Sequence, residues 1–134
     1  MRILICGSRD WTDVYAINCV LNGYLSDGDP ITVISGMAKG ADYIAAEWAR
    51  LNEQALVEFP PEWELYGKSA GPVRNREMLE QGKPEVVWAF KTHVESRGTN
   101  HMVNLCRKAA VPTYVVTAPG QSPSEPVGTN RETQ

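Results

Sequence analysis

Two glycine-bearing turns of this chain carry residues whose types and spacing suit the binding of a phosphate group. Each turn follows a short apolar run and precedes a helix-like segment, so the backbone beside the glycine can approach a ligand closely. The following helix would offer unpaired N–H groups and the positive end of its dipole to an anion. Serine, arginine and lysine side chains would add hydrogen bonds and charge. The candidate ligand-binding residues of these turns are Gly7, Ser8, Arg9, Ser35, Gly36, Lys39, Gly40 and Asp42.

Ordinary turns and helix caps use the same residue types, so this second interpretation stays open for each turn taken alone. The combination favours a site, because the carboxyl ends of parallel strands meet at one edge of a sheet. Two later segments add an arginine, an amide and another glycine-bearing turn that follows a strand. Their candidate ligand-binding residues are Arg74, Asn75, Gly98 and Thr99. Between the turns, Trp63 and Tyr66 could stack on a base or pack as a lid.

Several familiar motifs are absent from the sequence. No Gly-Lys pair is followed by Ser or Thr, and Gly7 lacks the further glycines of the dinucleotide fingerprint. The three cysteines form no Cys-x-x-Cys pair, which argues against a disulfide framework or a structural zinc site. We therefore expect no protein-bound metal or other cofactor, while a Mg²⁺ ion that accompanies a bound nucleotide stays open.

The elements that would position these residues alternate between strands and helices. Five short apolar runs predict strands at Ile3–Cys6, Ile31–Ile34, Ala55–Phe59, Val86–Phe90 and Thr113–Val116. Their apolar residues are nearly continuous, which is typical of a parallel sheet covered on both faces. Helical spacing predicts helices over 14–25, 44–51, 72–82 and 102–109, the first of them capped by Asp10 or Thr12. The chain is therefore expected to have an α/β fold.

Composition limits the class of protein. With 134 residues and 43% hydrophobic content the chain suits one domain, and its net charge of −3 argues against a broad basic face for nucleic acid. No apolar stretch is long enough to span a membrane, so we expect a cytoplasmic protein with no membrane partner. Residues 117–134 are rich in proline and polar side chains, which predicts a flexible tail after a domain at 1–116.

Taken in order, the motifs resemble the SLOG superfamily, which joins DNA-processing proteins of the Smf and DprA type with LOG phosphoribohydrolases. The resemblance rests on Gly7–Arg9, Ser35–Asp42, Gly71–Met78 and Arg97–Thr99, and it is greatest to the YspA-like, YpsA-related group of phages and bacteria. It implies a Rossmann-like three-layer sandwich with a five-stranded, mostly parallel sheet in the order 3-2-1-4-5. It also implies a homo-oligomer and a nucleotide-derived ligand at the carboxyl edge of the sheet.

The resemblance to LOG enzymes fails at the catalytic acid. Their signature, Pro-Gly-Gly-x-Gly-Thr-x-x-Glu, is matched only at Gly98 and Thr99, and Met102 occupies the position of the glutamate. A thioether neither activates water nor stabilises a positive charge as a carboxylate does. The candidate replacements are Glu77, Glu95, Asp42 and His101. Whether the chain is an enzyme stays open.

The preferred hypothesis is the binding or sensing of a nucleotide-derived ligand, such as a nucleoside phosphate, ADP-ribose or an NAD derivative. One alternative is a LOG-like phosphoribohydrolase that cleaves the N-glycosidic bond of a nucleotide. Another is a DprA-like module that binds single-stranded DNA, which the acidic net charge disfavours.

Overall fold

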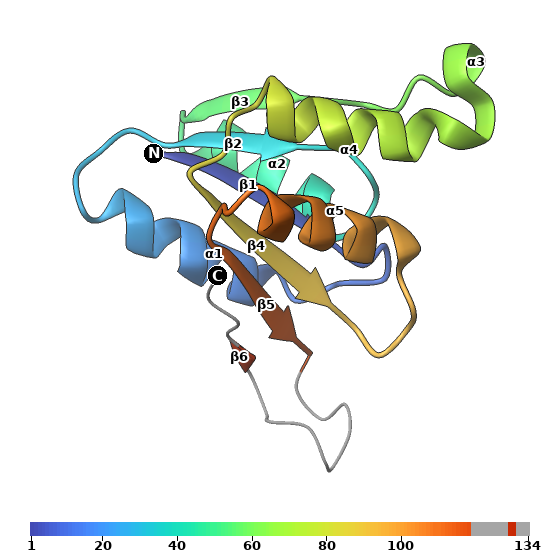
Figure 1. Ribbon diagram of the computed structural model, residues 1–134. Helices are drawn as coiled ribbons and strands as arrows, with labels where there is room; N and C mark the ends of the chain where they lie inside the picture. Colours follow the sequence, from blue (N-terminus) through green and yellow to red (C-terminus); the bar gives the residue numbers. More distant parts are fainter. Residues whose placement is uncertain (119–128, 131–134) are drawn as a thin grey trace.

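Strands and helices alternate along the chain in the computed structural model, which describes residues 1–118 and 129–130 (Figure 1). The first half contains β1 (Arg2–Gly7), α1 (Val14–Leu25), β2 (Thr32–Ser35), α2 (Ala41–Leu51) and β3 (Ala55–Glu58). The second half contains α3 (Trp63–Tyr66), the 3₁₀ turn η1 (Gly67–Ser69), α4 (Ala70–Glu80), β4 (Val86–Lys91), α5 (Arg97–Lys108), β5 (Thr113–Thr117) and β6 (Thr129–Asn130).

The sheet has the order β3-β2-β1-β4-β5-β6, and its first five strands run parallel. This confirms the α/β, Rossmann-like fold with five parallel strands in the order 3-2-1-4-5. The short strand β6 was not expected, and it pairs antiparallel to β5 through Val116 and Thr129. The strand order reverses between β1 and β4, where Gly7 lies beside Phe90. Ligands of open α/β sheets bind outside the carboxyl ends of the strands at such a reversal.

Two hydrophobic clusters, one on each face of the sheet, give the protein its three layers (Figure 1). On one face Ile3 and Ile5 pack with residues of α1 and α2, including Ile17 and Trp48. On the other face Leu4 and Cys6 pack with residues of α4 and α5, including Met78, Met102 and Cys106. Burial on both faces explains why the strands have nearly continuous apolar sequences.

Two details of the first two helices differ from the sequence-based expectation. Asp13, not Asp10 or Thr12, caps α1, and its side chain accepts a hydrogen bond from the N–H of Ala16 at 3.1 Å. The chain turns before this cap, because the N–H of Trp11 donates to the carbonyl of Ser8. Leu51 is 81% exposed instead of packed, since it is the last residue of α2.

Both later helices begin earlier than expected. Helix α4 starts at Ala70, so Pro72 lies in its first turn, where a missing N–H breaks no helical hydrogen bond. Helix α5 starts at Arg97, because Ser96 caps it. Gly98 and Thr99 therefore belong to the first turn of α5 and not to a turn that precedes it.

The predicted tail at 117–134 lies mostly outside the described residues, which omit 119–128 and 131–134. Within it, Thr117 ends β5 and Thr129–Asn130 form β6, so the boundary at 116 is one residue early and part of the segment pairs with the sheet. A backbone ladder needs no apolar periodicity, which explains why β6 could not be predicted from the apolar pattern. Among the helices described, none has the length and apolarity needed to cross a membrane.

Candidate functional site

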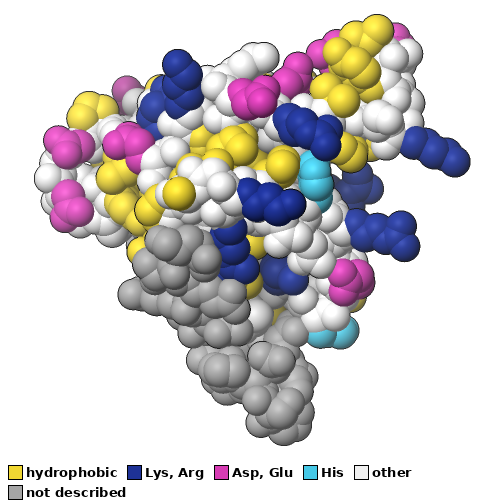
Figure 2. All heavy atoms as spheres, in the orientation of Figure 1, with side chains coloured by type: hydrophobic (Ala, Val, Ile, Leu, Met, Phe, Trp, Pro, Cys, Tyr) yellow, Lys and Arg dark blue, Asp and Glu magenta, His cyan; other side chains and the backbone are white. Residues whose placement is uncertain are grey.

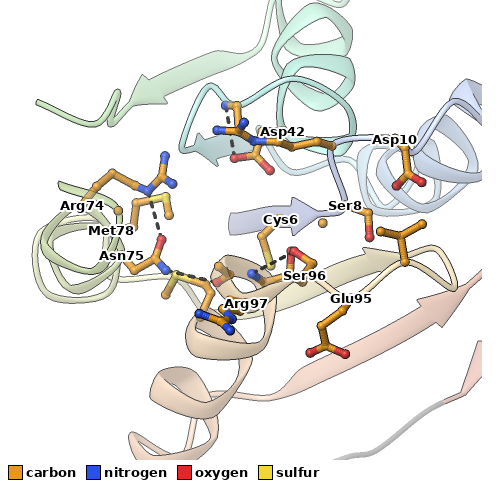
Figure 3. A pocket seen from close by; sticks show the side chains of 18 of the residues that line it. Cys6, Ser8, Asp10, Asp42, Arg74, Asn75, Met78, Glu95, Ser96 and Arg97 are labelled. Atoms are coloured by element: carbon orange, nitrogen blue, oxygen red, sulfur yellow. Dashed lines mark hydrogen bonds between the residues drawn. The ribbon is translucent and has the colours of Figure 1, made fainter. Parts of the chain in front are cut away.

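A cavity of about 510 Å³ lies at the carboxyl ends of the strands, between α4, α5 and the N-terminus of α2 (Figure 3). Figure 3 shows Arg74 and Asn75 of α4 on one side, Ser96 and Arg97 at the start of α5 below, and Asp42 above. The structure brings together at this cavity eight of the residues expected to bind ligand: Gly7, Ser8, Arg9, Asp42, Arg74, Asn75, Gly98 and Thr99.

In the second glycine-bearing turn, Ser35 and Gly36 make hydrogen bonds within the protein. Ser35 is fully buried, and its hydroxyl donates to the carbonyl of Asp42 and accepts from the N–H of Met37. The carbonyl of Gly36 accepts a hydrogen bond from Arg74 at 2.6 Å. Lys39 does not line this cavity but a neighbouring hollow, as does Gly40.

Two N–H groups in the first turn of α2 bond within the protein and do not serve a ligand in this cavity. The N–H of Ala41 donates to the carbonyl of Ser8 at 3.4 Å, and the N–H of Tyr43 donates to the carbonyl of Ala38 at 3.1 Å. These acceptors come from the turns themselves, so donors that were expected to face a ligand are already used. The second turn contributes Ala38 and Asp42 to the cavity instead.

Two of the glycines are required by close packing within the protein. A Cβ atom on Gly7 would overlap the Phe90 carbonyl oxygen and lie 2.7 Å from the Cβ of Ala41. A side chain on Gly40, whose φ is +90°, would overlap the carbonyl of Ser8. The packing alone explains both glycines, as the alternative interpretation of the turns proposed.

The N-terminus of α5 opens into the cavity. The hydroxyl of Ser96 accepts a hydrogen bond from the N–H of Thr99 at 3.3 Å and donates to its Oγ1 at 2.7 Å. The backbone N–H groups of Arg97 and Gly98 have no acceptor within the part of the chain that the structure describes. A helix of this kind directs its unpaired N–H groups and the positive end of its dipole toward an anion.

Ser8, Arg9 and Arg97 line the same cavity as these N–H groups. Ser8 is 2% exposed, and its Oγ accepts a hydrogen bond from the N–H of Thr92 at 3.0 Å. Arg9 and Arg97 are exposed and make no side-chain hydrogen bond or ion pair among the described residues. Their guanidinium groups are therefore available to a ligand.

Asp42 and Arg74 form the buried, charged part of the cavity. Asp42 is 5% exposed, and burial raises the pKa of its carboxyl to about 7, against the opposing effects of Arg74 and of the Ala38 N–H. Burial lowers the pKa of the Arg74 guanidinium, while Asp42 opposes this change. Arg74 donates from Nε to Asn75 at 3.0 Å as well as to the Gly36 carbonyl. The Arg74 side chain is therefore fixed in position.

Asn75 links this arginine to α5. Its Nδ2 donates to the carbonyl of Gly98 at 3.2 Å and lies 3.0 Å from Nδ1 of His101. Nδ1 accepts this hydrogen bond only when it carries no proton, and burial together with the charge of Arg76 lowers the pKa of His101. Asn75 thus holds the side chain of Arg74 and the first turn of α5 relative to each other.

The candidate acids separate into two groups. Glu95 and Asp42 line the cavity, whereas Glu77 and His101 do not. Met102 lines it at 1% exposure and, with Cys6 and Met78, provides a floor of sulfur-containing side chains.

Several lining residues were missing from the sequence-based set, namely Cys6, Asp10, Ala38, Gly71, Met78, Val94, Ser96 and Arg97. Ser96 and Arg97 could have been found, because a serine followed by a helix-like segment indicates an N-cap. Trp63 lines the cavity while 53% exposed, but Tyr66 does not line it.

Comparison with known proteins identifies the family. A model of the YspA, cpYpsA-related SLOG family matches residues 1–66. The Gene 61 protein of Mycobacterium phage D29 is 38% identical over 117 residues, which cover 83% of this chain and 92% of that protein. DNA processing protein A (DprA) from Streptococcus pneumoniae has a similar fold, with a TM-score of 0.67 and 17% identity. The match covers 92% of this chain and 52% of that chain, so this chain spans about half the length of that DprA. The chain belongs to the YspA, cpYpsA-related SLOG family.

Proposed function

We propose that this protein binds a nucleoside phosphate in the cavity, with the phosphate at the N-terminus of α5. The observation that carries the proposal is the pair of unbonded N–H groups of Arg97 and Gly98 beside the free guanidinium groups of Arg9 and Arg97. Membership of the SLOG family supports a nucleotide-related role in general.

The charges around the cavity favour an anion. Three arginines and three carboxylates line it, and the Asp42 carboxyl is partly protonated near neutral pH, so positive charge is in slight excess. Asp10 accepts a hydrogen bond from Thr92 at 2.7 Å, Glu95 accepts one from Asn100 at 2.7 Å, and burial raises the pKa of Asp42. The guanidinium groups of Arg9 and Arg97 lack a partner among the described residues. Figure 2 shows several Lys and Arg side chains on the side of the molecule where the parallel strands end.

The remaining walls suit the rest of a nucleotide. Trp63 offers a half-exposed ring on which a base can stack. Arg74 and Asn75 line the same cavity, and Asn75 contacts the first turn of α5, so both can contact the ribose or base. The apolar floor of Cys6, Met78 and Met102 supplies the apolar contact area that small-molecule sites commonly have.

Two substitutions at one position separate the side chain from the backbone N–H. Arg97→Ala removes only the guanidinium, whereas Arg97→Pro also removes the N–H. Proline suits this first helical position, because Ser96 before it is extended, with φ −130° and ψ 100°. Lys108→Ala, at the other end of α5, is the matched control.

Isothermal titration calorimetry with nucleoside 5′-monophosphates would test the proposal. We expect Arg97→Ala to weaken binding about tenfold and Arg97→Pro to weaken it about tenfold more, with helix content unchanged by circular dichroism. Equal affinities of Arg97→Ala and Arg97→Pro would contradict a role for the N–H group. Failure of the wild type to bind any nucleotide would refute the proposed function.

A second candidate function, hydrolysis of the N-glycosidic bond, is favoured by one observation. The Asp42 carboxyl lines the cavity, and its pKa of about 7 lets it hold a proton near neutral pH. It could protonate the leaving base while Glu95 activates water, so that water adds across the C–N bond to give the free base and ribose 5-phosphate. Chromatography would show whether the wild type releases free base, and Asp42→Asn should abolish that release.

A further inference from the structure

A second hollow, of about 1050 Å³, adjoins the cavity on the other side of the first glycine-bearing turn. Arg9 and Asp10 line both spaces. The other walls come from the segment that follows the first turn and from the start of α2, including Thr12, Lys39, Gly40 and Tyr43. The two spaces therefore adjoin at this turn.

The second hollow has a free lysine and free backbone N–H groups that could bind an anion. Lys39 is exposed and makes no side-chain hydrogen bond or ion pair with any residue that the structure describes. The backbone N–H groups of Lys39 and Gly40 likewise have no acceptor in this part of the chain. Asp10 supplies the one negative charge among the lining residues, and its Oδ1 already accepts a hydrogen bond from Thr92. Arg9 and Lys39 together leave the hollow with a net positive charge.

Two features separate this hollow from the first cavity. The turn that contains Arg9 is fixed by backbone hydrogen bonds, since the N–H of Ser8 donates to Phe90 at 2.9 Å and the carbonyl of Ser8 accepts from Trp11. Tyr43, which is 49% exposed, forms a wall that the first cavity lacks. The hollow is thus a distinct place with its own cation and its own wall.

We propose that this hollow binds a second phosphoryl group, so that the preferred ligand is a nucleoside with two phosphoryl groups placed on opposite sides of Arg9. The proposal rests on the proposed function of the first cavity. A single monophosphate would fill only the site at α5. The second group can be joined to the first as a diphosphate or carried on the other side of the ribose.

Calorimetry with adenosine 5′-monophosphate, adenosine 5′-diphosphate and adenosine 3′,5′-bisphosphate would test this. The wild type should bind at least one of the two-phosphoryl ligands about tenfold more tightly than the monophosphate, and the better of the two reveals how the groups are joined. Lys39→Ala should remove most of this tenfold preference, while Arg9→Ala should weaken all three ligands. Lys68→Ala, an exposed lysine that lines neither space, is the control.

The outcomes distinguish this proposal from the proposed function. If the wild type binds the monophosphate but shows no preference for a second phosphoryl group, the second site is refuted and the first stands. If Lys39→Ala weakened the affinity for all three ligands equally, the second site would also be refuted, because Lys39 would then act on the first cavity. Binding of a single-stranded oligonucleotide that depends on Lys39, without a preference among the adenosine ligands, would assign the hollow to nucleic acid instead. If no nucleotide binds, both proposals fail.

Discussion

Replacement of Asp42 by asparagine should change the pH dependence of stability in a way that the structure specifies. Burial raises the pKa of this carboxyl from its ordinary value of 3.8 to about 7. Between these values the folded protein holds a proton that the unfolded chain releases, so stability falls as the pH rises. The slope is about 1.4 kcal/mol per pH unit, and the loss between pH 5 and pH 8 is about 3 kcal/mol. Asparagine has nearly the same shape and does not titrate.

Urea unfolding at several pH values between 5 and 8 would measure this effect. The free energy of unfolding of Asp42→Asn, relative to that of the wild type, should rise by about 3 kcal/mol from pH 5 to pH 8, most of it below pH 7. Asp29→Asn, at an exposed position, controls for the loss of one negative charge. Parallel curves for Asp42→Asn and the wild type would show that the Asp42 carboxyl is not raised by burial, and the argument from its environment would be wrong.

Three further predictions concern packing, capping and thiol accessibility. Gly7→Ala should lower the free energy of unfolding, measured in urea, by about 1–3 kcal/mol, because the new methyl group would overlap the Phe90 carbonyl oxygen. An unchanged free energy of unfolding would mean that the strand can shift. Ser96→Ala should lower it by about 1 kcal/mol, because the cap on the N–H of Thr99 is lost, and an unchanged value would refute the cap. A thiol reagent should label Cys19 alone in the folded protein, since the other cysteines are buried, and fast labelling of all three would contradict this.

The sequence predicted the layers of the fold better than the exact ends of its helices. Continuous apolar runs such as Ile3–Cys6 correctly indicated strands buried on both faces. The order of the strands followed from the family resemblance, because apolar patterns do not specify which strands are neighbours. The exposure of Leu51 and the cap at Asp13 depend on where each helix begins and ends, which local patterns define poorly.

The candidate site could likewise be predicted only in part, because its details depend on contacts between distant segments. Sequence reasoning found eight residues that line the cavity, most of them because they follow strands whose carboxyl ends meet at one edge, and Arg74 and Asn75 because their segment follows an irregular loop and resembles the family. It could not determine which helix N-terminus stays open. The carbonyl of Ser8 accepts the hydrogen bond of the Ala41 N–H in α2, and this contact joins residues that are far apart in the chain. Glu77 and Glu95 could not be separated either, because the packing of α4 and the path of the chain between β4 and α5 decide which glutamate reaches the cavity.

The floor of the cavity limits the chemistry that the protein can perform. Met78 and Met102 carry no proton near neutral pH, and burial raises the pKa of the Cys6 thiol well above its ordinary value. Among the lining side chains, the carboxyl groups of Asp10, Asp42 and Glu95 are therefore the candidates for transferring a proton to a ligand. Asp42→Asn consequently separates the two candidate functions. If the protein only binds its ligand, the wild type and the variant should bind with equal affinity and neither should release free base. An enzyme should release free base in the wild type and lose this turnover in the variant while it keeps the affinity.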